Sequence, residues 1–157
     1  MTLRAFIGLA AMLALSVIPP MAAAQAASLP TTKLKIGNQT VTAEIAATKA
    51  SRTHGLMSRA SLPNGHGMIF VFDTVDVYCF WMKDTTLPLS IAFIDDHGTV
   101  INTDDMQPLS EAAHCPLGPI RYALEMKQGW FVAHHIAAGS KVSDLPPPPT
   151  KPSANLP

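Results

Sequence analysis

Short strand-like segments separated by turn residues fill the middle of this chain, and they limit its fold more than any other feature. Residues 89–94 and 99–103 surround an Asp-Asp-His-Gly turn and predict the clearest hairpin. Residues 34–36 and 41–45 predict another hairpin around a Gly-Asn turn. Residues 120–126 alternate apolar and polar side chains, which favours a further strand with one polar side.

The remaining segments of the core predict buried strands and short helices. Residues 68–72 and 77–82 are continuous apolar runs, typical of strands that are covered on both faces. Helical spacing over 48–60, with Thr48 as N-cap, and a second segment at 128–138 predict two short helices. We therefore expect a mainly β fold, β-rich α+β, built as a compact, mainly antiparallel sandwich or barrel.

The N-terminus has the pattern of an export signal. Residues 1–26 contain Arg4, a long apolar run and an Ala-Gln-Ala end, which together predict a cleaved signal peptide. The alternative is an uncleaved membrane anchor over residues 5–24, although Pro19 and Pro20 interrupt such a helix. With cleavage, we expect a periplasmic or secreted protein that does not contact a membrane.

The C-terminus predicts a tail. Residues 145–157 hold six of the 14 prolines and few large apolar side chains, so burial cannot offset the entropy of ordering them. We expect a proline-rich disordered tail there and a single domain over residues 31–144.

The charge balance argues against nucleic acid as a partner. The chain has 11 basic and 11 acidic side chains, whereas a protein that neutralises several phosphates needs a basic excess. We expect a monomer whose partner is a small molecule or a protein that the sequence does not identify.

Five motifs, in this order, resemble the domain of unknown function 192 family over almost the whole core. They are Gly55-Leu56-Met57-Ser58-Arg59, Gly67-Met68-Ile69-Phe70-Val71-Phe72, Phe80-Trp81-Met82-Lys83-Asp84-Thr85, Pro88-Leu89-Ser90-Ile91-Ala92-Phe93-Ile94-Asp95, and Tyr122-Ala123-Leu124-Glu125 with Gly129.

The resemblance implies a compact, mainly β domain, similar to a jelly-roll-like sandwich and often placed behind an export signal. It implies no activity, because none is established for the family. The chain departs from the family pattern twice: Asp84 replaces a usual asparagine, and Cys115 stands where an aromatic residue is more usual.

Cys79 and Cys115 are the only thiols of the chain. An oxidising compartment favours a disulfide between them, which would tie the loop around Cys115 to the 77–82 segment. Two alternatives are a pair of buried free thiols and a catalytic cysteine assisted by His114.

One face of the 77–82 segment carries the candidate binding residues. Trp81 and Lys83 would share a face that can stack a ring and hold an anion, with Arg59, and also Arg52, contributed by the first helix. Asp95 and Glu125 are the candidate acceptors, so the set Arg59, Trp81, Lys83, Asp95 and Glu125 forms a hypothetical site for an anionic or sugar-like ligand.

Each of these residues also has a structural interpretation. Trp81 can belong to the core, Lys83 can pair with an acid, and Arg59 can pin a helix to the sheet. Asp95 lies at a hairpin, where aspartate commonly caps the backbone of the turn.

We expect a non-catalytic module that binds a small ligand or a partner. The alternative is a periplasmic hydrolase that uses Asp95 and Glu125 as paired carboxylates. We expect no cofactor and no metal: the sequence has no glycine-rich phosphate loop, its six histidines lack the spacing of zinc motifs, and its core methionines are typical of packing.

Overall fold

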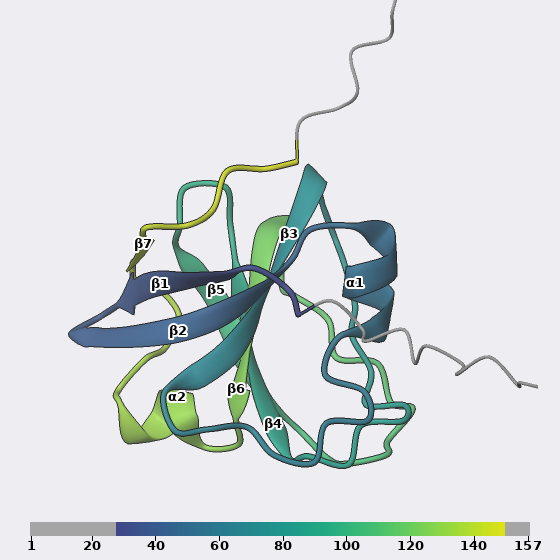
Figure 1. The fold of residues 1–157 in the computed structure, drawn as a ribbon. Helices are drawn as coiled ribbons and strands as arrows, with labels where there is room; N and C mark the ends of the chain where they lie inside the picture. Colours follow the sequence, from purple (N-terminus) through teal and green to yellow (C-terminus); the bar gives the residue numbers. More distant parts are fainter. Residues whose placement is uncertain (1–27, 150–157) are drawn as a thin grey trace, which may run out of the picture.

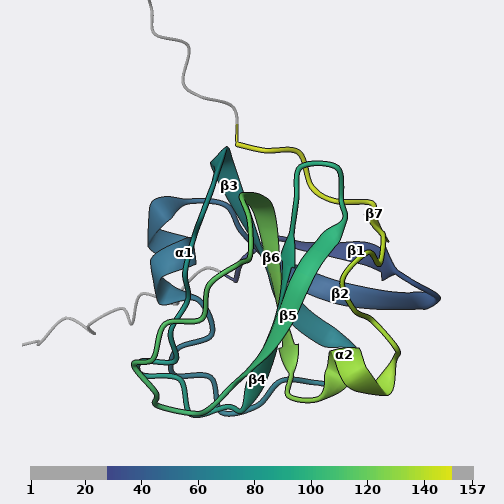
Figure 2. The ribbon, with the colours of Figure 1, turned by 180° about the vertical axis from the view of Figure 1, so that it is seen from behind.

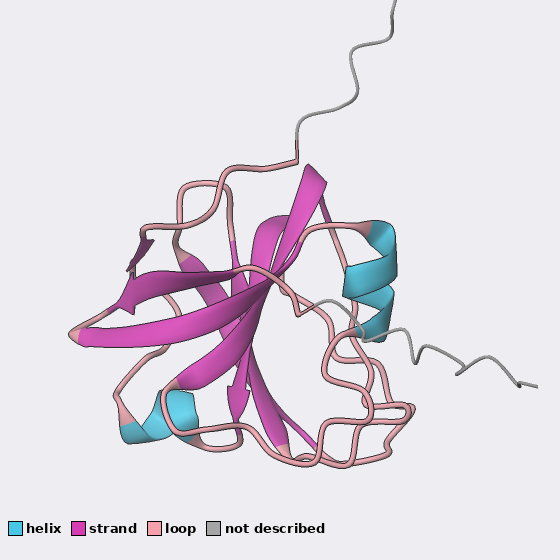
Figure 3. Ribbon diagram, viewed as in Figure 1, coloured by secondary structure: helices cyan, strands magenta, loops and turns pink. Residues whose placement is uncertain are grey.

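The computed structural model describes residues 28–149, which form one seven-stranded sheet and two short helices (Figures 1 and 3). The elements in chain order are β1 (Thr31–Ile36), β2 (Gln39–Ala46), α1 (Lys49–His54), β3 (His66–Asp76), β4 (Leu89–Ile94), β5 (Val100–Met106), β6 (Ile120–Lys127), α2 (Trp130–Ala133) and β7 (Val142–Ser143). The predicted mainly β class with two short helices is confirmed.

The strand order is β5-β4-β6-β3-β2-β1-β7, and the sheet is mainly antiparallel, as predicted, with one parallel pair. β2 and β3 are parallel, with Glu44 opposite Met68, whereas the other pairs are antiparallel. Parallel neighbours require a long crossover. The chain between β2 and β3 supplies it, because it leaves the end of β2, forms α1 and returns to the start of β3.

The sheet curls so far that its two edges meet, as the view from behind shows (Figure 2). Val142 N donates to Gly98 O at 2.8 Å, and Val100 N donates to Ser140 O at 2.9 Å. These backbone bonds join the segment before β7 to the start of β5. The result is a half-barrel whose open side is bridged.

The curl divides the apolar side chains into two cores. The inner core receives side chains from all seven strands and is closed by Phe131 of α2 and by Ile136. The outer core lies on the other face of the central strands, where Met68, Phe70 and Phe93 pack beneath loops and α1. Strands β3 and β4 are therefore buried on both faces over residues 68–72 and 89–94.

The predicted helices are shorter in the structure. The first begins as expected after Thr48, whose side chain accepts from Ser51 N, but it ends at His54 instead of Ala60. Gly55 ends it because its φ of 51° leaves the right-handed helical region. The second helix has a single turn, 130–133, instead of 128–138.

The segment 77–82 is not a regular strand, although its side chains alternate as predicted. β3 ends at Asp76, and the chain then crosses the outer face with one isolated bridge, Phe80 to His114. Tyr78, Phe80 and Met82 turn toward the sheet, and Val77 and Trp81 are exposed.

The expected ends of the domain are only partly covered by the described residues. Leu145 packs against the inner core and Pro146 is buried, so ordered packing extends past Asp144. The rest of the predicted tail from 150 and the predicted signal peptide, 1–26, lie outside the described residues. Within residues 28–149, no helix has the length and apolar character needed to cross a bilayer.

At Gly67, β3 leaves no room for a Cβ atom against β6, and this contact generates a prediction. A Cβ atom added there would lie 2.4 Å from Glu125 O and 2.4 Å from Met126 Sδ. We expect Gly67→Ala to lower the free energy of unfolding by about 2–4 kcal/mol, measured by urea denaturation. Gly118→Ala is the control, because its Cβ would meet nothing closer than 3.8 Å. Equal stability of the two variants would contradict the prediction.

Candidate binding pocket

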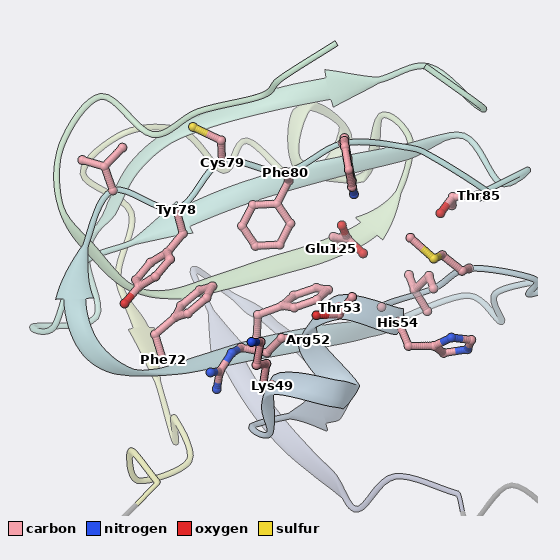
Figure 4. A pocket seen from close by; sticks show the side chains of 16 residues that line it. Lys49, Arg52, Thr53, His54, Phe72, Tyr78, Cys79, Phe80, Thr85 and Glu125 are labelled. Atoms are coloured by element: carbon pink, nitrogen blue, oxygen red, sulfur yellow. The ribbon is translucent and has the colours of Figure 1, made fainter. Parts of the chain in front are cut away.

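A pocket of about 480 Å³ lies on the outer face of the sheet, between α1 and the segment 77–85 (Figure 4). Its floor comes from β3 and β6, through Phe70, Phe72 and Glu125. The helix α1 contributes one wall, and the segment 77–85, called the crossing segment below, contributes the opposite wall. The pocket lies within the size range of small-molecule sites. Its lining residues are Lys49, Arg52, Thr53, His54, Gly55, Leu56, Met57, Phe70, Phe72, Val77, Tyr78, Cys79, Phe80, Trp81, Thr85 and Glu125.

Aromatic rings form most of the apolar lining. Phe80 meets Phe70 edge to face, with ring centroids 4.9 Å apart, and Tyr78 stacks on Phe72 at 3.7 Å. Each pair joins a ring of the crossing segment to a ring of β3. These contacts hold the segment against the sheet. Trp81 completes the set at the mouth, with 53% of its surface exposed.

Backbone hydrogen bonds fix the course of the crossing segment. Phe80 N donates to His114 O, and His114 N donates to Phe80 O, both at 2.8 Å. Met82 N donates to Ser110 O at 2.9 Å. Asp84 has a φ of 55°, a conformation that aspartate and asparagine tolerate better than most residues, and its carbonyl accepts from Ser58 N. The Asp84 substitution noted in the sequence therefore stands at a turn.

Glu125 is a buried carboxyl group without a compensating charge. It lies on β6 opposite Met68 of β3 and Ile91 of β4, and only 4% of its surface is exposed. Burial raises its pKa from 4.5 to about 8, with no opposing contribution from a cation or a hydrogen bond. Among the described residues, every fully buried side-chain oxygen has a hydrogen-bond partner. Because the carboxyl oxygens of Glu125 have none, they are accessible from the pocket that this residue lines. At neutral pH this side chain is mostly an uncharged acid.

Glu125 is the middle one of three acids in a row across the sheet. The paired registers place Glu44, Met68, Glu125, Ile91 and Asp104 side by side on five strands. Paired residues project to the same face of a sheet. Glu44 forms an ion pair with Arg59, and Asp104 contacts His114 Nδ1 at 2.6 Å. Only the middle acid of this described row has no basic partner.

The basic residues of α1 lie at the pocket without reaching Glu125. The Arg52 guanidinium donates to Ala47 O at 2.7 Å and Val71 O at 2.9 Å, and lies 3.4 Å from Asp73 Oδ1. It also stands 5.2 Å from the centroid of the Phe72 ring. Arg52 therefore pins the helix to β3. Lys49 and His54 are exposed on the same helix.

The structure brings some of the predicted site residues together and separates others. Trp81 and Glu125 line the same pocket, and Lys83 Nζ lies 5.7 Å from the centroid of the Trp81 ring. Arg59 does not line the pocket, because it is paired with Glu44.

Asp95 also lies outside the pocket. Its Oδ1 accepts from His97 N at 2.9 Å and from Thr99 N at 2.7 Å, which is the turn-capping arrangement. The second carboxylate of the hypothetical hydrolase is thus occupied in the turn between β4 and β5.

The two cysteines lie at disulfide distance from each other, and neither is a free thiol in the structure. Cys79 belongs to the pocket wall and Cys115 to the loop behind it, so a bond between them ties these two segments. His114 is engaged by Asp104. This geometry leaves no thiol for the alternative of a catalytic cysteine.

Most of the aromatic lining, and the helix residues of the pocket other than Arg52, were not predicted from the sequence. Phe70 and Phe72 were assigned only to a buried strand, as were Tyr78 and Phe80. Their spacing of two residues places each pair on one face, which is the signal that could have found them. Within residues 28–149, no group of three or more candidate metal ligands gathers.

Comparisons with known proteins agree with this fold. The model of the DUF192 family, described as uncharacterised, matches residues 32–143. A proposed transcription regulator from Sinorhizobium meliloti 1021 has a similar structure, with a TM-score of 0.72 and 28% identity, over 74% of this chain and 95% of that one. A protein of unknown function from Novosphingobium aromaticivorans DSM 12444 matches with a TM-score of 0.71 and 29% identity, over 78% and 91%. A search of curated proteins finds no match.

Glu125 makes stability depend on pH in a predictable direction. The folded protein keeps the proton up to about pH 8, whereas an unfolded glutamate loses it near 4.5. Because the folded state binds more protons in this window, the free energy of unfolding falls as pH rises through it, by at most about 1.4 kcal/mol per pH unit. We expect Glu125→Gln to remove this slope in urea titrations between these values. Glu44→Gln, in the same row, should retain it; a slope unchanged in Glu125→Gln would contradict the assignment.

The cysteine pair generates a second prediction. We expect alkylation of the unfolded, unreduced protein to leave its mass unchanged, and reduction to add two labels. The double variant Cys79→Ser/Cys115→Ser should lose about 2–4 kcal/mol of stability, because the loop between the cysteines is freed in the unfolded chain. Two labels without reductant would refute the bond.

Proposed function

Because the chain belongs to the DUF192 family, whose members are uncharacterised, its function has to be argued from the site, and we propose a non-catalytic module that binds a small molecule. The ligand would enter the pocket between α1 and the segment 77–85. The observation that carries this proposal is the combination of a roomy aromatic pocket and a single buried acid at its floor.

The composition of the pocket supports binding more than hydrolysis. Small-molecule sites combine apolar and aromatic walls with a few polar groups that orient the ligand. Here the rings supply the apolar contact, and Glu125 and Thr85 supply the polar contacts. A paired-carboxylate hydrolase needs a second acid within about 5–10 Å of the first. Glu125 is the only acid among the residues that line this pocket, and Asp95 caps a turn elsewhere.

We place this binding function outside the cytoplasm. The pattern of residues 1–26 is the reason for expecting export. A cysteine pair at disulfide distance is common in oxidising compartments and rare in the cytosol. Cell fractionation of the tagged full-length chain tests this part: recovery in the cytoplasm with residues 1–26 still attached would refute it.

Trp81 offers a direct readout of ligand entry. The chain has two tryptophans, and Trp130 lines a separate cavity of about 280 Å³. In a Trp130→Phe background, fluorescence therefore reports on Trp81 alone. We expect small-ring probes that differ in charge, namely benzyl alcohol, benzoate and benzyltrimethylammonium, to include at least one that changes this fluorescence in a saturable way.

A matched pair of variants on α1 places the binding event. Thr53 lines the pocket, whereas Ala50 is exposed on the same helix and does not. We expect Thr53→Phe to fill the pocket and lower the affinity for the bound probe at least about tenfold, and Ala50→Phe to leave it unchanged. Saturable binding that Thr53→Phe does not weaken, or no binding of any of the three probes, would contradict the proposed function.

A further inference from the structure

Resting on this proposed function, we propose that the ligand carries one cationic nitrogen, which enters the aromatic enclosure and pairs with Glu125, and that its binding expels the carboxyl proton. The ligand class is therefore a small ammonium compound, protonated or quaternary, on a body that fits a pocket of about 480 Å³.

The row of three acids carries the first step. Glu44 and Asp104 project to the same face as Glu125, and both have a basic side chain of this protein beside them. Glu125 projects to the same face, but it has no basic side chain beside it and lines the pocket. A buried carboxyl group is costly unless it is paired or neutral. A cationic group on the ligand would give Glu125 the basic partner that the protein's own side chains give the other two acids.

The walls around the carboxyl suit a cation. Phe80, Phe70 and Trp81 line the same pocket as Glu125 (Figure 4). Phe70 pairs with Ala123, which is two residues before Glu125 on the same face of β6, so its ring is a near neighbour. Ring faces attract ammonium groups, and the attraction grows when the cation is desolvated. A neutral ligand would make the same apolar contacts but would lack the attraction between its charge and the ring faces.

The basic side chains around the pocket either have other partners or are exposed to solvent, and none forms an ion pair with Glu125. From α1, Arg52 is held by Asp73 and two backbone carbonyls, and Lys49 and His54 are exposed to solvent. From the crossing segment, Tyr78 lines the pocket with its hydroxyl 2.7 Å from Thr74 Oγ1, and Lys83 Nζ lies 5.7 Å from the centroid of the Trp81 ring. From β3 and β4, the neighbours of Glu125 in the row are apolar.

The proton balance fixes the pH dependence. The neutral carboxylic acid and the ammonium ion become a carboxylate–ammonium pair, and the carboxyl proton goes to the buffer. Because the free protein holds that proton up to about pH 8, binding at pH 7 should release most of one proton per ligand. Affinity should rise about tenfold per pH unit toward that pKa and level off above it. A quaternary probe keeps its own charge constant across the range.

The experiment is calorimetric titration of the purified protein with choline and with its neutral carbon isostere, 3,3-dimethylbutan-1-ol, each in phosphate and in Tris. Benzyltrimethylammonium and tetramethylammonium extend the cation series in size. We expect at least one cation to bind at least about tenfold more tightly than the neutral isostere, with a heat that differs between the buffers by the released proton. The wild-type comparison of buffers does not depend on any variant.

Two variants separate the cation pairing from the pocket itself. Glu125→Gln, with folding checked by circular dichroism, should abolish proton release and the pH dependence of binding. Thr53→Phe should abolish binding at every pH. If the isostere binds as well as choline, or binding releases no proton, the cation inference fails while the proposed function stands. If none of the cations binds up to about 10 mM, the inference also fails, because the proposed site would then show no measurable affinity for ammonium compounds.

A final arm separates a free ammonium compound from a lipid headgroup that carries one. Phosphatidylcholine vesicles should not sediment the protein, because the proposal assigns a small molecule to the pocket. Sedimentation that Thr53→Phe abolishes would overturn that assignment.

Discussion

The carboxyl group of Glu125, buried on the outer face of the central strands without a partner, is the constraint on which the site depends. Its burial requires that β3 packs closely against β6, which Gly67 permits, and that the segment 77–85 covers the sheet. Without that cover the carboxyl would be hydrated and would have an ordinary pKa. The rings of Phe80 and Tyr78 hold the cover in place through Phe70 and Phe72, so the aromatic packing and the raised pKa of Glu125 have one origin.

The sequence was sufficient for the class of fold because alternation and turn residues are local signals. The hairpin of β4 and β5 and the strand β6 lie where the patterns place them. The parallel pairing of β2 with β3 was missed, because a short helix between two strands does not reveal which neighbour the returning strand will take. The first helix was overextended for a local reason: Gly55 interrupts an apolar spacing that continues beyond it.

For the site, sequence reasoning placed Trp81 and Glu125 in one set, and the structure brings them to one pocket. It could not foresee that Arg59 pairs with Glu44, which is 15 residues away and reaches it only through the crossover. Asp95 had two interpretations, and the backbone amides of the turn favour the structural one. The aromatic walls combine β3 with a segment that leaves the sheet, and the continuous apolar run at 77–82 concealed that departure.

The ionisation of Glu125 itself can be followed by carboxyl ¹³C chemical shifts across a pH titration of the free protein. We predict a midpoint near pH 8, far above the ordinary 4.5 of a glutamate. A midpoint at the ordinary value would contradict it, because the carboxyl would then be hydrated or paired, and neither a buried acid at the floor of the pocket nor a proton for a ligand to displace would exist.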